Sequence, residues 1–144
     1  MFKKLLVPVD GSLGSFNALD VAIDMANAIK ADVAILTVVH VMPAPSWHVD
    51  PEMKSPTDSV ELSSKMGDQI ISMAKIKAEK IEGKAEFHNL KGYPSDTIVE
   101  QAKALGCDCI VIGSRGLSGI EKLFLGSVSS QVAQTAEVPV LLVK

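Results

Sequence analysis

The sequence predicts an α/β fold in which five parallel strands form one open sheet with helices on both faces. Five short segments typical of strands recur along the 144 residues, and four of them are rich in apolar and β-branched residues. Helical patterns separate them and leave room for the long crossovers that parallel strands require. Those four segments are mostly apolar, as strands covered on both faces are. We therefore expect a doubly wound sheet, and the length predicts one domain over residues 1–144.

The first half of the chain predicts two strands joined by a helix. Residues 4–9 are apolar after Lys4 and precede Asp-Gly-Ser, which is typical of a buried strand ending in a turn. Ser12 or Ser15 is a candidate N-cap, and apolar residues then recur at helical spacing as far as Ile29. Residues 32–41 form the second strand.

The next segment, residues 42–56, changes character. It contains four prolines and the only tryptophan, Trp47. A loop of this length in a compact domain is usually functional or mobile. We expect either a mobile flap over a ligand or a plain variable linker.

A long helix is predicted over residues 57–81, ended by Gly83. Leu62, Met66, Ile70 and Met73 fall on one face of it. We interpret the Met66 and Met73 stripe as helix core rather than as a cofactor box.

The remaining elements complete the alternation. A strand is predicted over residues 85–90, and a helix begins at Pro94, since proline suits the first helical position. A strand over residues 109–112 leads into the glycine-rich residues 113–126. Ser127 is then expected to cap a short helix that runs to residue 136, and residues 138–143 form the last strand.

Composition excludes several classes of protein. Hydrophobic residues make up 47% and charged residues 22%, which is ordinary for a chain with a sizeable core. The net charge of −3 argues against a nucleic-acid partner, because such proteins usually carry a basic surplus. The apolar run of residues 5–9 is too short for a signal peptide, and no run reaches the ~20 residues of a membrane span. We expect a cytoplasmic protein with no membrane partner.

The glycine-rich segment is the strongest candidate for chemistry. It joins a strand end to a helix start, where glycines let a ligand approach the backbone and free N–H groups favour phosphate. Ser127 and Ser129 add hydroxyls, and Arg115, the only arginine, suits phosphate oxygens. The established phosphate-loop and dinucleotide motifs are absent. On mechanism alone, a phosphate site and an ordinary turn stay open alternatives.

Other candidates divide between function and structure. Asp10, at the end of the first strand, can hold ribose hydroxyls or a metal-bound water, or form an Asx-turn. The three histidines share no metal-ligand spacing. Cys107 and Cys109 are too close for a zinc pattern and exclude a disulfide framework, so we expect core packing. No catalytic arrangement and no metal site are predicted.

The spacing Gly113-x-x-Gly116, nine residues, then Gly126-Ser127 resembles the nucleotide motif of the universal stress protein family, in its ATP-binding branch. The opening strand with Asp10-Gly11-Ser12 and the closing Pro139-Val-Leu-Leu-Val resemble the family as well. The resemblance implies a Rossmann-like sheet in the order 3-2-1-4-5. It also implies a homodimer and an adenine nucleotide, ATP, with a divalent ion, expected to be Mg²⁺.

The resemblance carries over to site residues one by one. Pro8, Asp10 and Val41 match positions at the adenosine end, and Val9 lies between the first two. The positions that match the phosphate end are Gly113, Gly116, Gly126, Ser127, Val128 and Ser129. The family does not imply a role for Arg115, because this position varies in the family. Arg115 is included in the predicted site because a guanidinium pairs well with phosphate oxygens.

Three functional hypotheses follow. The leading one is an ATP-binding stress-response module whose state follows nucleotide occupancy. The second is an enzyme with slow ATP hydrolysis or self-phosphorylation, with Ser127 or Ser129 as acceptors. The third is an interaction protein with a vestigial site. A homodimer is expected through residues 138–143, which are apolar on both faces and stand one residue from the end of the sequence.

Overall fold

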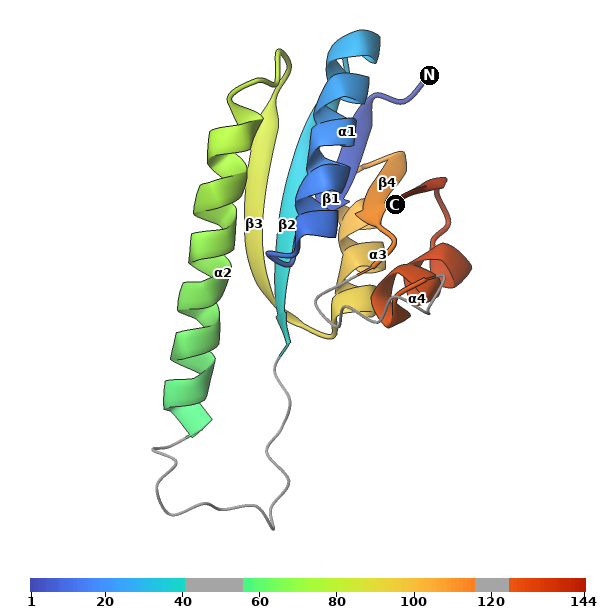
Figure 1. The fold of residues 1–144 in the computed structure, drawn as a ribbon. Helices are drawn as coiled ribbons and strands as arrows, with labels where there is room; N and C mark the ends of the chain where they lie inside the picture. Colours follow the sequence, from blue (N-terminus) through green and yellow to red (C-terminus); the bar gives the residue numbers. More distant parts are fainter. Residues whose placement is uncertain (41–55, 116–124) are drawn as a thin grey trace.

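The predicted parallel sheet is confirmed in a computed structural model, which describes residues 1–40, 56–115 and 125–144 (Figure 1). Its strands are parallel and ordered β3-β2-β1-β4-β5. In chain order the elements are β1 (Lys4–Pro8), α1 (Leu13–Ile29), β2 (Asp32–His40), α2 (Pro56–Ala78), β3 (Ala85–Gly92), α3 (Pro94–Ala104), β4 (Cys109–Gly113), α4 (Ser127–Thr135) and β5 (Val140–Val143).

The helices cover the two faces of the sheet in pairs, and each pair encloses one half of the core (Figure 1). Successive strand residues point to opposite faces. Leu5 and Val7 of β1 therefore pack toward α1 and α2, whereas Leu6 packs toward α3 and α4. All three are fully buried, which explains why the strand is apolar without alternation.

The parallel register places the carboxyl ends of β1, β2 and β4 side by side at the same end of the sheet. Val7 pairs with Ile35 and Pro8 with Leu36, and the N–H of Val9 donates to the carbonyl of Leu36 at 2.8 Å. The strand order reverses between β1 and β4. Ligands of open α/β sheets bind at such a switch point.

The starts of α1 and α4 show which residues cap these helices. Of the two candidates before α1, Ser12 is the N-cap, and its hydroxyl accepts a hydrogen bond from the N–H of Ser15 at 3.2 Å. The prediction for α4 was wrong, because its N-cap is Gly126 and Ser127 is the first helical residue. Glycine is tolerated at this position, and the Ser127 side chain is left exposed.

The predicted core stripe of α2 was also wrong. Met66 and Met73 are 57% and 55% exposed. The face that packs on the sheet carries Ile71, Ala74 and Ala78. Two of these side chains are small and let the helix axis approach the sheet, and the two methionines lie on the opposite, exposed side of the helix. The helix ends at Ala78, before the predicted residue 81.

The two cysteines lie in the core, as expected. Cys107 is 4% and Cys109 is 2% exposed, and both are free thiols. Burial raises the pKa of Cys107 to about 11 and raises that of Cys109 as well. The reactive thiolate is therefore disfavoured at neutral pH at both positions.

Candidate functional site

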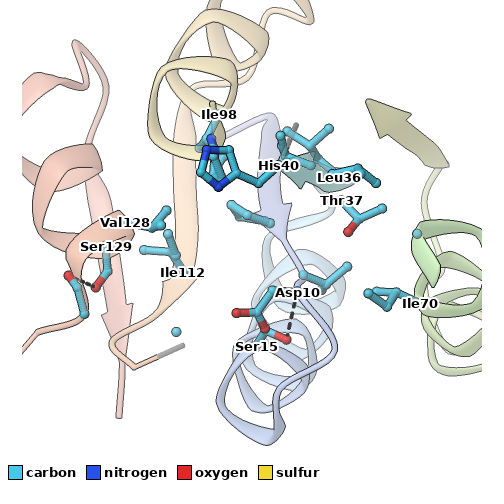
Figure 2. A pocket seen from close by; sticks show the side chains of 18 of the residues that line it. Asp10, Ser15, Leu36, Thr37, His40, Ile70, Ile98, Ile112, Val128 and Ser129 are labelled. Carbon is cyan, nitrogen blue, oxygen red and sulfur yellow. Dashed lines mark hydrogen bonds between the residues drawn. The ribbon is translucent and has the colours of Figure 1, made fainter. Parts of the chain in front are cut away.

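A cavity of about 470 Å³ opens at the carboxyl ends of β1, β2 and β4 (Figure 2). This volume suits a small organic ligand. Strand ends, the start of α4 and one side of α2 all contribute to its walls. Its described lining is Pro8, Val9, Asp10, Ser15, Leu36, Thr37, Val38, Val39, His40, Ser63, Met66, Gly67, Ile70, Pro94, Ile98, Ile112, Gly113, Arg115, Gly126, Ser127, Val128 and Ser129.

The turn after β1 fixes Asp10 at the mouth of the cavity. Its Oδ1 accepts from the N–H of Ser12 at 2.9 Å, and its own N–H donates to the Ser15 hydroxyl at 3.3 Å. Gly11 supplies the positive φ of 87° that this turn needs. Asp10 therefore forms an Asx-turn, and its exposed carboxylate still faces the cavity (Figure 2). The structural and the ligand-facing roles coexist.

The end of β2 gives the cavity an apolar wall on each side of the sheet. Leu36 faces Ile98 and Ile112 in one core half, whereas Thr37 lies on the opposite face, toward Ile70 (Figure 2). At the rim, the His40 ring meets Tyr93 edge to face, with centroids 5.3 Å apart. This wall can accept a flat apolar group such as a heterocyclic base.

Gly113 is required by packing. A Cβ at this position would lie 2.8 Å from the carbonyl oxygen of Gly14, at the start of α1. Side chains essentially never approach a backbone atom so closely, so β4 and α1 can meet here because residue 113 is glycine. The close contact holds the start of α1 and the end of β4 at one corner of the cavity.

The entry to α4 is held by Ser114. Its carbonyl accepts the N–H of Gly126 at 2.6 Å and the Ser129 hydroxyl at 3.0 Å. The Ser129 hydroxyl also lies 3.1 Å from the carbonyl of Gly126 and is buried. This hydroxyl is therefore used to anchor the loop, and Ser129 would offer a ligand its backbone N–H.

The first turn of α4 is well suited to an anion. First-turn N–H groups of a helix have no acceptor within the helix, and the positive end of the helix dipole lies there. Ser127 and Val128 line the cavity at this turn. Arg115 lines it too, with an exposed side chain. Positive charge and N–H donors without a helical acceptor thus meet at one end of a cavity that is lined elsewhere mainly by apolar side chains.

The structure gathers nine of the predicted site residues around this cavity. They are Pro8, Val9, Asp10, Gly113, Arg115, Gly126, Ser127, Val128 and Ser129. Val41 and Gly116 lie outside the described residues, as does the predicted loop over residues 42–56 except Pro56, which is the first residue of α2.

Sequence reasoning missed the contribution of α2, from Ser63, Met66, Gly67 and Ile70. It also missed Thr37 and Ile98. The alternation along β2 is a signal for Thr37, because every second residue of that strand faces the α2 side. For the α2 residues the sequence holds no comparable signal.

Two features are absent from the part of the chain that the structure describes. No three His, Cys, Asp or Glu side chains in residues 1–40, 62–115 and 125–144 gather closely enough to hold a metal ion. Among the helices of the described ranges, none combines the length and apolarity that a membrane crossing demands.

Comparisons with known proteins agree with this geometry. The model of the universal stress protein family matches residues 1–144. Universal stress protein YxiE of Bacillus subtilis is 36% identical over 155 aligned residues, which cover 100% of both chains. The structure of universal stress protein UspA from Lactobacillus plantarum covers 99% of this chain and 97% of its own, with a TM-score of 0.85 at 22% identity. That likeness supports the fold.

A universal stress protein solved in complex with cAMP has a TM-score of 0.73 and 28% identity, covering 99% of this chain and 97% of its own. Fold and cavity therefore define an open α/β sheet protein with a ligand cavity at the switch point between β1 and β4. Within that class, the chain belongs to the universal stress protein family.

Proposed function

We propose that the protein binds an adenine nucleotide, ATP with Mg²⁺, and acts as a regulatory module whose state follows nucleotide occupancy. The observation that carries the proposal is the asymmetry of the cavity. One end presents the first turn of α4 and Arg115, and the rest is lined mainly by apolar side chains, with Asp10 as its one carboxylate among the described lining residues. A nucleotide has the same asymmetry. The relative in complex with cAMP supports an adenine ligand.

The phosphates would lie over the first turn of α4. Backbone N–H groups of Ser127, Val128 and Ser129 would donate to them, and the exposed Ser127 hydroxyl and Arg115 would add further donors. The adenosine part would lie between the ends of β1 and β2, with the Asp10 carboxylate accepting ribose hydroxyls.

The residues present fit a magnesium ion held mainly through its ligand. Mg²⁺ keeps several waters and is usually bound through phosphates and one or two carboxylates. Asp10 is the acid of the described lining, and the described residues form no metal cluster of their own. The ion would supply charge neutralisation for the phosphates.

The alternative of slow hydrolysis or self-phosphorylation has weaker support. The Ser129 hydroxyl is buried and bonded to the carbonyls of Ser114 and Gly126, which makes it a poor acceptor. Ser127 is exposed and is the better candidate for that chemistry. Single-turnover assays with the bound nucleotide distinguish a binding module from a slow enzyme.

A proline at Ser127 tests the phosphate end. Proline is favoured at the first helical position, and the extended backbone of Gly126, φ −67° and ψ 161°, suits a residue before proline. Ser127→Pro thus removes one N–H and the hydroxyl while the helix is kept. Ser127→Ala removes the hydroxyl alone. A lost charge-assisted hydrogen bond costs about 1.5–3 kcal/mol.

By calorimetry, we expect Ser127→Pro to weaken ATP and AMP binding by roughly tenfold or more, while adenosine binding changes little. Ser127→Ala should fall between this variant and the parent protein. Removing Mg²⁺ by chelation should weaken ATP more than adenosine. Unchanged ATP affinity in Ser127→Pro, or a parent protein that binds no nucleotide, would overturn the proposal.

We also propose a homodimer that forms through β5. This strand ends the sheet order, so its outer backbone edge has no partner among the described strands. Two such edges paired about a two-fold axis would satisfy each other and close the assembly. Leu141 on this strand is 38% exposed, which fits a side chain near a contact.

A further inference from the structure

The outer face of α2 carries a row of exposed apolar side chains. Leu62, Met66, Met73 and Ile76 are 62%, 57%, 55% and 69% exposed. On the opposite side of the same helix, Ile71 and Ala74 pack on the sheet. The core of the protein is therefore complete without the exposed row, which we call the α2 stripe. Large apolar residues gathered on one surface mark an interaction site more often than chance.

The spacing of the α2 stripe is that of a helix seam. Its members are separated by four, seven and three residues, and Gln69 fills the middle of the seven-residue gap. The resulting 4-3-4-3 pattern is how apolar residues recur where two helices pack side by side. Gln69 is exposed in the middle of the stripe. Leu62 and Ile76 stand seven residues on either side of it, so the stripe is nearly the same read in either direction.

Charge along α2 is also self-complementary. Within the helix, residues 56–68 contain three acids and one lysine, and residues 69–78 contain two lysines and no acid. Of those lysines, Lys77 is paired with Asp20 of α1 at 2.8 Å, and Lys75 lies 5.5 Å from the ring centre of Phe87. An antiparallel copy of the helix would bring its acidic half against the basic half. A parallel copy would place like charges together.

We propose that the α2 stripe binds the α2 stripe of a second copy of this chain, antiparallel, about a two-fold axis near Gln69. Leu62 then lies across from Ile76 of the second copy, and the two Gln69 amides meet. The contact is isologous, because each partner uses the same surface. It is separate from any pairing through β5, since α2 packs on β2 and β3, at the other end of the sheet.

One row of apolar side chains is small beside stable interfaces, which bury about 1,200–2,000 Å². We therefore expect reversible association. Sedimentation should be followed from about 10 µM to about 1 mM, the range of weak specific binding. If β5 also pairs, the α2 contact appears as growth from dimer to tetramer. If β5 does not, it appears as growth from monomer to dimer.

Met73→Glu and Ser72→Glu form a matched pair of variants. Both add one negative charge at neighbouring exposed positions of α2, but only Met73 belongs to the stripe. Neither residue lines the cavity, so nucleotide binding serves as the check that both variants are folded. We expect Met73→Glu to weaken the α2 association at least tenfold and Ser72→Glu to change it less than about threefold.

Disulfide trapping tests the orientation. The native thiols are buried, so only cysteines introduced at the surface are expected to form disulfides between chains. An equal mixture of Leu62→Cys and Ile76→Cys chains should give a crosslinked dimer under mild oxidation, and Gln69→Cys should crosslink with itself. Leu62→Cys alone and Ile76→Cys alone should crosslink much less.

Three outcomes would overturn the proposal. One is association that does not grow with concentration up to about 1 mM, in which case the stripe serves a different partner or none. The second is equal weakening by Met73→Glu and Ser72→Glu. The third is crosslinking of the single Leu62→Cys and Ile76→Cys chains that exceeds crosslinking of the mixture, which would show a parallel pair.

Discussion

Lys4 and Glu86 show how a polar pair is placed at the edge of the core. The Lys4 ammonium lies 2.6 Å from Oε1 of Glu86, across the sheet from β1 to β3. This contact holds the pKa of Glu86 below its ordinary value and that of Lys4 above it. The Glu86 side chain is 41% exposed, so water screens the pair and its contribution to stability is small.

The pH dependence of this pair has a definite sign. Because the folded pKa of Glu86 is depressed, its contribution is present above the ordinary value of 4.5 and is lost as pH falls through the folded pKa. We expect Glu86→Gln to lower the free energy of unfolding at pH 7 by up to about 1 kcal/mol, a difference that disappears in acid. Urea unfolding from pH 7 to pH 2 checks this. Glu100→Gln, at an exposed acid of α3, should show no such trend.

Two glycines are needed for different reasons, Gly113 because a side chain would clash and Gly106 because of its backbone conformation. At Gly113 an added Cβ meets backbone atoms of Gly14 at 2.8 and 2.9 Å, whereas at Gly106 it meets nothing within 4 Å but φ is +66°. We expect Gly113→Ala to lower the free energy of unfolding by about 1–3 kcal/mol, because α1 must shift. Gly106→Ala should cost about 1 kcal/mol through backbone strain.

Nucleotide binding distinguishes these two variants further. The start of α1 carries Ser15 at the cavity, so its displacement in Gly113→Ala should also weaken ATP binding. Gly106 follows α3, away from the lining, and its variant should bind normally. Equal nucleotide affinities in the two variants would contradict this account of Gly113.

At the scale of elements, the start of α1 couples helix stability to the site. The Ser12 hydroxyl caps the helix through the N–H of Ser15, and the Ser15 hydroxyl in turn donates to the carbonyl of Ser12 at 2.9 Å. The same Ser15 hydroxyl accepts from the N–H of Asp10. One small network therefore holds both the helix end and the turn that presents Asp10.

Removing the cap tests this coupling. Ser12→Ala should lower the free energy of unfolding by about 1 kcal/mol, whereas Ser12→Asp should retain it, because aspartate is an equally good cap. Chemical denaturation measures both. If alanine and aspartate give the same stability, the hydroxyl is not acting as the cap in solution.

At the scale of the whole molecule, β5 leaves one row of backbone groups without a described partner. The N–H of Ile110 donates to the carbonyl of Pro139, and the N–H of Ser114 donates to the carbonyl of Val143. The backbone N–H and C=O groups of successive strand residues point alternately to the two sides. Those of residues 139, 141 and 143 therefore point toward β4, and those of residues 140 and 142 point toward the open edge. A proline at Leu141 would damage the sheet of the protomer itself, whereas one at Leu142 removes a donor from the outer edge.

The dimer proposal predicts a difference between two variants at this position. Leu142→Pro should shift the protein toward monomer in analytical ultracentrifugation, because it removes an edge donor and obstructs the ladder. Leu142→Val keeps the N–H and should sediment as the parent protein does. Retained nucleotide binding confirms that Leu142→Pro is folded. A parent protein that is monomeric at tens of micromolar would refute the contact through β5.

The sequence by itself determined the alternation of strands and helices, the family, and the set of residues at the strand ends. These follow from local patterns: mostly apolar segments, a cap candidate at Ser12 or Ser15, and the spacing of Gly113, Gly126 and Ser127. Parallel strands that end at one edge bring Asp10 and the start of α4 to a common place, so the site could be anticipated without coordinates.

Only the tertiary structure decided which face of each element is used. Met66 and Met73 have helical spacing, yet they are exposed, because α2 approaches the sheet through Ala74 and Ala78. Gly113 stands in a ligand-like motif, yet its nearest constraint is the carbonyl of Gly14 in a different element. Hydrophobic burial and close packing depend on the surface that an element meets, and that surface comes from residues far away in the chain.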